Sequence, residues 1–343
     1  MKYNSFKELE KAYSVPKYME ALTLLKNGMK NLPEEEFQKH LFTIMLDRAQ
    51  LHSKSGLYDE CLKDLTYLVD RGYVCPLFWS RFSDPFTNSK EYTKIREKND
   101  FLRNQQQENV SFEWEVLLPQ NYTEGKKYPL FITLHGDGDN IAYHKEFWKP
   151  KELLNKGFIV AYIQSSQLDG HNGYTWTKTV FYSPDQKNWP DSEQIRPVSK
   201  SSYEIKQCYD SAYDEIKRCY EAINNEYSID ENSIIIGGFS GGSSAAIEIA
   251  LTNTVPVKGF IALCSAKSNL FTKENVKGLL HRGVKGVFMD GEKDLPVQEV
   301  EEMMKDFKDI GVPYQYYIND GIGHSYPDDL NDKLVQGVDF ILK

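Results

Sequence analysis

Six short apolar runs in the second part of the chain do not alternate with polar residues. Strands that are buried on both faces have this pattern. Helical spacing of apolar residues separates several of the runs, most clearly at Tyr203–Tyr227 and Val297–Ile310. Alternating strands and helices predict an α/β fold with a mostly parallel sheet and helices on both faces. The runs are Leu130–Leu134, Phe158–Ile163, Ser233–Gly237, Phe260–Cys264, Gly286–Asp290 and Tyr314–Ile318.

The first hundred residues have a different pattern. Apolar residues recur at helical spacing over Tyr18–Leu32, Phe37–Leu51 and Tyr58–Val69, which predicts an all-α domain. Residues 83–108 are mostly polar, and we interpret the three successive glutamines Gln105–Gln107 as marking the linker. From Ser111 apolar and polar residues alternate, which predicts a half-exposed strand. We therefore expect a helical domain with its linker at residues 1–108 and a second domain at residues 109–343.

One stretch of the first domain, Ala49–Leu62, resembles the middle of a tetratricopeptide repeat. The shared features are a turn formed by a glycine and an aromatic residue, Gly56 and Tyr58, and a small residue three places on in the next helix, Cys61. The resemblance implies a tetratricopeptide-like domain that binds a protein partner or associates with itself. Since stacked repeats usually need three or more copies, an ordinary helical cap on the second domain is the alternative.

Composition and charge exclude several classes of protein. The net charge of −9 argues against nucleic-acid binding, because phosphate contacts need clustered Lys and Arg. No apolar run approaches the length that spans a bilayer, so we expect no membrane association. The five cysteines are an odd number without metal-ligand spacing, and Met1–Leu9 is polar, unlike a signal peptide. These features predict a cytoplasmic protein.

The strongest chemical signal is the motif Gly238-Phe239-Ser240-Gly241-Gly242, which has the form G-x-S-x-G. An apolar run precedes it and a helical pattern follows it. This strand–turn–helix context is that of a nucleophile elbow, in which glycines allow a strained turn to expose the serine. Ser240 is therefore the predicted nucleophile.

A serine hydroxyl needs a base, and the base needs an orienting acid. Downstream of Ser240 there are two histidines, His281 and His324. His324 follows the last predicted strand in a glycine-rich loop, where a base at the sheet's carboxyl edge belongs, whereas His281 precedes a strand. Asp294 follows the preceding strand and is the predicted acid. Asp290, at the end of that strand, and Glu292 are its rivals.

Two backbone N–H groups must point at the oxyanion that develops during acyl transfer. One belongs to Gly241, directly after the nucleophile. The other is expected from the loop after an early strand, at Asp137 or alternatively Gly136. His135 begins this loop and precedes the nucleophile in sequence. For it we expect a structural hydrogen bond rather than the role of base.

Residues 111–343 resemble the phospholipase/carboxylesterase and dienelactone-hydrolase-like branch of the α/β-hydrolase superfamily. The resemblance rests on Leu134-His135-Gly136, Gly238–Gly242, Asp290–Asp294 and Gly323-His324-Ser325, which match in type, order and spacing. It implies an α/β-hydrolase fold and Asp294 as the acid. The acidic Asp137-Gly138-Asp139 loop is less typical and could disfavour acidic substrates.

The long stretch Gln164–Ser202 is rich in aromatic residues and proline. Loops of this length are often functional, so it could roof the serine and form a substrate pocket. Tyr174 and Trp176 in this stretch, with Phe239 beside the nucleophile, are the predicted substrate contacts. Packing of the loop onto the sheet is the alternative.

We therefore expect a serine hydrolase that cleaves a carboxylic ester of a small or medium-sized molecule through an acyl-enzyme. The motifs imply no metal or cofactor. A peptidase or thioesterase would use the same triad, because acyl chemistry is shared. A catalytically idle protein that binds a partner through its helical domain is the third interpretation.

Overall fold

The computed structural model describes residues 17–343 except 177, 182–195, 198–204, 209 and 295–296. The chain divides into two compact units, which we describe separately. The first comprises residues up to Val110 together with Leu168–Gly173 and Thr179–Gln207. The second comprises Ser111–Gln167, Tyr174–Lys178 and Cys208–Lys343. We call them the helical unit and the sheet unit.

The helical unit precedes the sheet in sequence, as the sequence predicts. Its core is formed by the apolar faces of successive helices and includes Leu25, Ile44, Leu65 and Phe82, all fully buried. Gly56, with φ of 73°, forms the turn between the second and third predicted helices. The elements are α2 (Tyr18–Asn31), α3 (Glu34–Lys39), α4 (Leu41–Lys54), α5 (Tyr58–Asp70), α6 (Ser80–Ser83), the 3-10 turn η2 (Asp84–Phe86) and α7 (Lys90–Gln107).

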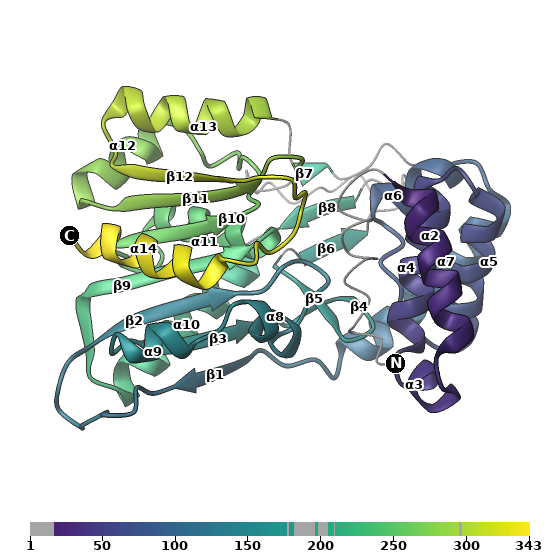
Figure 1. Ribbon diagram of the computed structural model, residues 1–343, viewed down its shortest axis with the longest axis horizontal. Coiled ribbons are helices and arrows are strands. Elements are labelled where there is room, and N and C mark those ends of the chain that lie inside the picture. The colour runs from purple at the N-terminus through teal and green to yellow at the C-terminus, as the bar shows by residue number, and fades with distance from the viewer. Residues whose placement is uncertain (1–16, 177, 182–195, 198–204, 209, 295–296) are drawn as a thin grey trace. The chain divides into compact units, whose positions relative to one another are not determined.

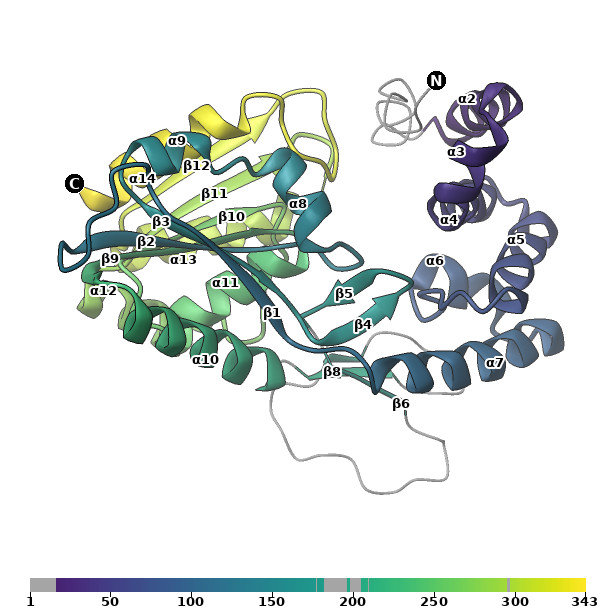
Figure 2. The same cartoon turned by 90° about the horizontal axis from the view of Figure 1, so that it is seen from below.

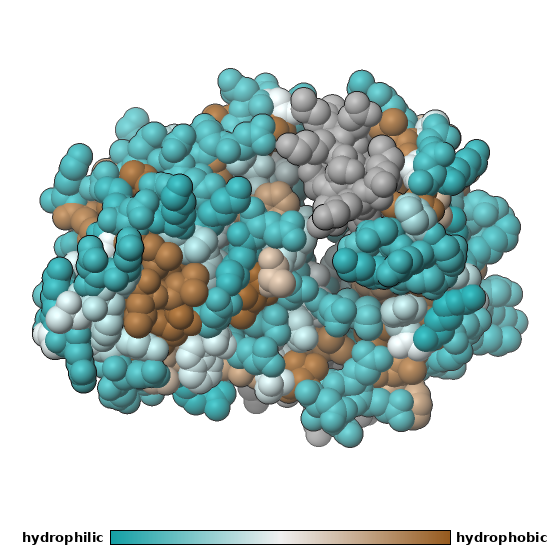
Figure 3. Space-filling model, turned by 60° about the horizontal axis from the view of Figure 1, so that its bottom comes forward, coloured by the Kyte–Doolittle hydropathy of each residue, from teal (hydrophilic) through white to brown (hydrophobic). Residues whose placement is uncertain are grey.

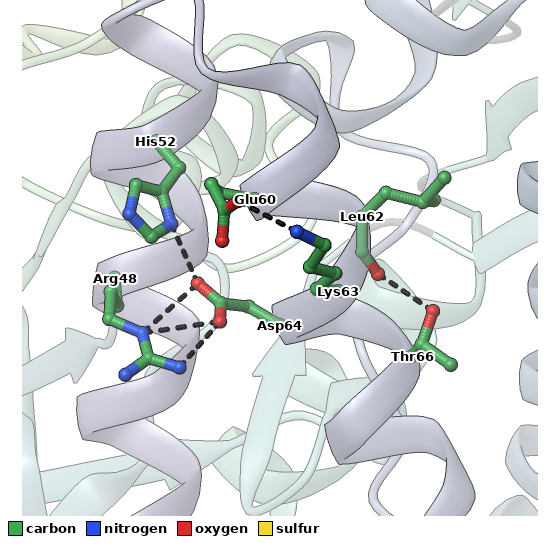
Figure 4. A network of polar contacts seen from close by, with 7 residues as sticks. All are labelled: Arg48, His52, Glu60, Leu62, Lys63, Asp64 and Thr66. Carbon is green, nitrogen blue, oxygen red and sulfur yellow. Dashed lines mark hydrogen bonds and ion pairs between the residues drawn. The ribbon is translucent and has the colours of Figure 1, made fainter.

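A buried polar network joins α4 to α5 (Figure 4). The Asp64 carboxylate accepts hydrogen bonds from the Arg48 guanidinium, at 2.6 and 3.1 Å, and lies 2.8 Å from Nδ1 of His52. Asp64 and His52 are both buried. A buried carboxylate is tolerated only when charge and hydrogen bonds compensate for its lost hydration, so the network fixes how the two helices pair. The tetratricopeptide-like character of this pair stays a prediction.

The glutamines expected to mark the linker, Gln105–Gln107, are helical and form the end of α7. Its Gln, Glu, Lys and Arg residues have good helix propensity and need no apolar partner on a solvated face. The opposite face is buried through Tyr92, Ile95, Asn99 and Arg103. The low apolar content of this segment therefore reflects a helix with one solvated face and a partly polar buried face, and not an unstructured segment.

Leu168–Gly173 belongs to the helical unit although it lies far along the chain. It includes most of strand β4 (Gln167–Gly170), which pairs with β5 (Gly173–Thr175). From α7, Arg103 Nε donates to the Leu168 carbonyl at 2.9 Å, and Gln107 Oε1 accepts from the Leu168 N–H at 2.8 Å. The His171 N–H donates to the Val74 carbonyl at 2.8 Å. The helical unit is thus completed by a segment from between two parts of the sheet unit.

The sheet unit contains the predicted mostly parallel sheet, in the order β1-β3-β2-β9-β10-β11-β12 (Figure 1). The edge strand β1 pairs antiparallel with β3, and the other neighbours are parallel. Each predicted run is a strand, and the alternating segment after Ser111 is β1. The strands are β1 (Glu113–Leu117), β2 (Tyr128–Leu134), β3 (Ile159–Gln164), β9 (Ile229–Phe239), β10 (Gly259–Leu263), β11 (Lys285–Gly291) and β12 (Tyr314–Asn319).

Helices cover both faces of the sheet, which explains why its inner strands are apolar over most of their length (Figure 2). On β2, Leu130 and Ile132 pack on one face, while Phe131 between them packs on the other. The first face is covered by α10 (Asp210–Glu226), α11 (Gly241–Thr252), α12 (Lys273–Arg282) and α13 (Val297–Ile310). The second is covered by α8 (Ile141–Phe147), α9 (Lys151–Asn155) and α14 (Leu330–Leu342).

The helix expected over Tyr203–Tyr227 begins only at Asp210. Ile205–Cys208 is strand β8, in a small sheet with β6 (Lys178–Phe181) and β7 (Arg196–Pro197). An apolar residue such as Ile205 fits helical and strand spacing equally in so short a segment. Much of the aromatic stretch predicted to roof the serine, including Tyr182 and Trp189, lies outside the described residues.

The surface in Figure 3 is mostly hydrophilic, with apolar side chains gathered in separate spots. Among the described residues, no helix has the length and apolar character needed to cross a membrane. The cytoplasmic location stays a prediction.

Candidate active site

Ser240 lies on the sharp turn between β9 and α11. Its φ of 52° and ψ of −119° are unfavourable for a residue with a side chain. The Ser240 N–H donates to the Leu263 carbonyl of the neighbouring strand at 2.9 Å. Backbone strain of this kind persists only where the surroundings impose it. The turn therefore presents the Ser240 hydroxyl at the carboxyl edge of the sheet.

The glycines around Ser240 are required by close backbone approach. A Cβ atom at Gly238 would lie 2.6 Å from the Gly242 carbonyl carbon and 2.8 Å from the Leu134 oxygen. A Cβ atom at Gly242 would overlap the carbonyl groups of Leu134 and His135. The elbow and the start of the loop after β2 are thus in backbone contact, which the G-x-S-x-G pattern makes possible.

His324 and Asp294 complete a continuous chain of hydrogen bonds with Ser240. His324 follows β12, and its Nε2 lies 2.8 Å from the Ser240 Oγ. On the other side of the ring, Nδ1 lies 2.8 Å from Asp294 Oδ1, in the loop after β11. The His324 side chain is 45% exposed and that of Asp294 only 5%. A serine, an exposed imidazole and a shielded carboxylate in this order can activate the hydroxyl.

The two rival acids have other surroundings. Asp290 is 3% exposed at the end of β11, and burial, with the nearby Asp294 charge, raises its pKa to about 7. Glu292 accepts the Gly321 N–H at 2.8 Å and so holds the loop that leads to His324. Neither makes the bond to the imidazole that Asp294 makes. His281 is on α12 and is exposed, away from this constellation in sequence and fold.

The loop after β2 brings Asp137 to Gly241. The Asp137 carboxyl is so close to Gly241 that a Cβ atom there would overlap it. Its Oδ1 accepts hydrogen bonds from the Thr175 hydroxyl at 2.8 Å and the Trp176 N–H at 3.1 Å. Gly241 begins α11, where backbone N–H groups have no intrahelical acceptor. Both residues predicted to form the oxyanion hole thus lie side by side next to Ser240.

Gly136 and Phe239 pack against each other beside this loop. A Cβ atom at Gly136 would lie 2.8 Å from the Phe239 ring, so glycine is needed there. The Phe239 ring centroid is 5.1 Å from that of His324. Phe239 is 8% exposed and therefore offers little of its ring to a substrate.

His135 and Trp176 are fully buried beside the loop after β2. Burial lowers the pKa of His135 to about 4, so its ring is neutral. His135 Nδ1 lies 2.7 Å from the Gly136 carbonyl oxygen, and Nε2 accepts the Ser165 N–H at 3.3 Å. The Trp176 indole N–H donates to the His135 carbonyl at 2.7 Å, and its side chain is fully buried. Trp176 therefore supports the oxyanion loop and has no surface for a substrate.

Tyr174 also holds the oxyanion loop through its backbone. Its N–H donates to the Asp139 carbonyl at 2.9 Å, and its carbonyl accepts the Gly138 N–H at 2.8 Å. The partly exposed side chain leaves a substrate contact open as a prediction.

Two residues near His324 escaped sequence reasoning. Tyr326 follows it by two residues, and its hydroxyl reaches the buried His144, which lies on α8. In the sequence, the only indication of Tyr326 was an aromatic residue two places after His324. His144 had none, because only the fold brings it there.

Metal-ligating side chains also meet at this site. Among the described residues, Cys264, Asp294 and His324 offer ligand atoms within 4.8 Å of one another. Burial and the nearby carboxylates raise the pKa of the Cys264 thiol well above its usual value. Since the thiolate is the form that binds metals, these surroundings disfavour a cysteine-ligated ion.

Comparison with known proteins identifies the family and supports the fold. The model of the phospholipase/carboxylesterase family matches residues 122–330. No protein with curated annotation matches the chain. A structure of the esterase PE8 is 18% identical, with 68% of this chain and 100% of that one covered and a TM-score of 0.50. An uncharacterized protein from Bacillus cereus ATCC 10987 is 20% identical over 99% of both chains, with a TM-score of 0.48.

Proposed function

The chain belongs to the phospholipase/carboxylesterase family and is a carboxylesterase-type hydrolase of the α/β-hydrolase superfamily, and we propose how it acts. We propose that it cleaves a small or medium-sized carboxylic ester through Ser240, His324 and Asp294. The observation that carries the proposal is the unbroken hydrogen-bond chain from Asp294 through His324 to the Ser240 hydroxyl. Its order is that of acid, base and nucleophile in acyl transfer.

In the first step, Ser240 Oγ attacks the ester carbonyl carbon while His324 Nε2 takes its proton. The Asp294 carboxylate at Nδ1 keeps the imidazole in the tautomer that can accept a proton at Nε2, and it stabilises the imidazolium that forms. The carbonyl oxygen becomes an oxyanion, which the N–H groups of Gly241 and Asp137 would bind. His324 then gives its proton to the leaving alkoxide, and an acyl-enzyme remains.

In the second step, His324 takes a proton from water, and the resulting hydroxide equivalent attacks the acyl carbonyl. Collapse of the second oxyanion returns the proton to Ser240 and releases the carboxylic acid. The Asp137 carboxylate beside Gly241 adds negative charge next to the expected oxyanion hole. We therefore expect neutral or cationic acyl groups to react faster than anionic ones, because like charges repel at short range.

We favour an ester as the substrate because the family match points to ester bonds, and the described residues of the site include no feature that favours a peptide or a thioester. The idle-binder interpretation requires no particular geometry at Ser240. It would leave the strained turn, the shielded acid and the aligned base without a chemical reason.

The first experiment treats the wild type and Ser240→Ala with a fluorophosphonate, locates the adduct by mass spectrometry, and measures hydrolysis of p-nitrophenyl esters of increasing chain length. We expect the adduct on Ser240 and a kcat lower by about four orders of magnitude or more in the variant. Ser233→Ala is the matched control, since Ser233 hydrogen-bonds Asp230 at the far end of β9. Equal turnover in wild type and Ser240→Ala, or an adduct elsewhere, would refute the assignment.

A further inference from the structure

The loop that carries His324 is held on its upstream side by the loop that carries Asp294. The Gly321 N–H donates to Glu292 at 2.8 Å, and the Lys293 N–H donates to the Ile322 carbonyl at 2.9 Å. These bonds fix the base relative to the acid. They do not tie the base to the strand that leads into the oxyanion loop.

Tyr326 supplies that second attachment on the downstream side. Its hydroxyl lies 3.0 Å from Nδ1 of His144, and the His144 Nε2 lies 2.7 Å from the Thr133 Oγ1. Thr133 is on β2, two residues before His135 and the oxyanion loop. A line of hydrogen bonds thus connects the loop of the base with the strand of the oxyanion hole.

Two aromatic rings pack against the Tyr326 ring. It stacks on Phe147 with ring centroids 4.5 Å apart and planes 4° from parallel, and it packs against Phe239 in a tilted arrangement with centroids 4.1 Å apart and planes at 33°. Phe239 in turn contacts the His324 ring and directly precedes Ser240. A shift of Tyr326 would therefore reach both the base and the nucleophile.

We infer that Tyr326 is a positioning residue. Through its hydrogen bond to the Thr133–His144 pair, it holds His324 in register with Ser240 and the oxyanion hole. The inference deepens the proposed function and rests on it. Because the His324 side chain is nearly half exposed, its position depends on the loop that bears it. Displacement of a catalytic group by about 1 Å costs on the order of a hundredfold in rate.

The protonation states keep this connection intact near neutral pH. Burial holds the pKa of His144 well below, and that of the Tyr326 phenol well above, its usual value. The imidazole is therefore neutral and the phenol protonated. One ring nitrogen of His144 then donates and the other accepts, and either tautomer satisfies both hydroxyl partners.

The test compares the Tyr326→Phe variant with the Tyr128→Phe variant, each made in the full chain. Both remove a tyrosine hydroxyl with hydrogen-bond partners, but that of Tyr128 bonds Asn121 and Thr123 near the start of β2. We expect Tyr326→Phe to lower kcat by about tenfold to a hundredfold with KM changed less than about twofold, since positioning acts on the transition state. Tyr128→Phe should keep kcat at a similar melting temperature.

A second variant checks the route. His144→Phe should lower kcat similarly, and the double variant should lose no more than the worse single variant, because both substitutions remove one connection. If Tyr326→Phe does not fold, His144→Gln takes its place with the same expectations.

Equal kcat in the two tyrosine variants, or additive losses in the double variant, would overturn the inference while leaving the proposed function standing. A wild-type protein that neither hydrolyses p-nitrophenyl esters nor reacts with the fluorophosphonate would overturn the proposed function itself.

Discussion

Asp290 and Asp294 lie on one short segment, yet their surroundings give them different chemistry. Asp294 is shielded but bonded to His324, which can carry its countercharge. Asp290 lies behind it in the core, and burial with the Asp294 charge raises its pKa to about 7. Two neighbouring carboxyl groups in different surroundings commonly take different roles. We propose that Asp294 takes part in the reaction, whereas Asp290 lowers the stability of the folded protein when it is ionised.

That cost has a definite pH dependence. The pKa of Asp290 is about 7 in the folded protein and 3.8 in an exposed chain, so between these values the folded state binds more protons. Unfolding free energy therefore falls as pH rises from about 4 to about 7, by on the order of 4 kcal/mol at most, and the cost stays in full above that. The melting temperature of Asp290→Asn should exceed that of the wild type by more at pH 8 than at pH 5.

The control for this variant is Asp309→Asn, an exposed aspartate on α13. Its melting temperature should follow that of the wild type at both pH values. A gain for Asp290→Asn that is the same at pH 5 and pH 8 would show that Asp290 is ionised in the folded protein throughout.

At the site, the sequence placed the three triad residues and the oxyanion loop, and the structure brings these side chains together. Their catalytic roles stay predictions. The motif carried this information because Gly238 and Gly242 are required by the local backbone. Tyr326 and His144 were missed because their meeting depends on how β2, α8 and the last loop pack. The Asp137 carboxyl beside Gly241 was missed for the same reason.

The pairing of α4 with α5 depends on a buried ionic group instead of apolar area alone. Removing the Asp64 charge leaves the buried His52 and the Arg48 guanidinium with a weaker partner. Unbalanced buried charge is costly, so the helix pair should open more readily.

Asp64→Asn should lower the protection of α4 and α5 amides, measured by hydrogen exchange with mass spectrometry, by about 1–3 kcal/mol. The exposed Asp59→Asn, in the first turn of α5, should change it by less than about 1 kcal/mol. Exchange in β9–β11 serves as the internal reference. Unchanged protection in Asp64→Asn would mean that apolar packing alone fixes the pair.

Strands were predictable where both faces are buried, because a run such as Val287–Met289 fits no exposed structure. The beginnings of helices were less so. Ile205–Cys208 matched the stripe of α10 but forms a strand, since partner strands distant in sequence decide its structure. The polar end of α7 was mistaken for a linker, because its buried face consists of Asn99 and Arg103, whose partners lie elsewhere in the chain.

In the molecule as a whole, the chain crosses between the two units more than once. The chain leaves the sheet unit after Gln167 and returns at Tyr174, and the intervening segment is bonded to α7 and to Val74. Deleting residues 1–108 would remove those partners. The buried polar groups of the segment would then lack hydrogen bonds.

We expect the protein shortened to residues 109–343 to have a lower melting temperature, or to aggregate, by calorimetry and light scattering. In the full chain, Arg103→Met keeps the aliphatic stem but removes the bond to Leu168, which should cost about 1–3 kcal/mol. For a unit of this size that is roughly 2–4 °C per kcal/mol. A shortened protein as stable as the full chain would show that the two units are independent.

The return of the chain to the helical unit also has a consequence for inheritance. A module gained by joining two genes end to end is connected at a single junction, and it can be exchanged without altering its neighbour. Here Asp169, which interacts electrostatically with Arg103, lies in a segment of the helical unit whose codons fall between those of two parts of the sheet unit. Recombination at residue 108 would separate these two positions, so they should change together in descendants of this gene.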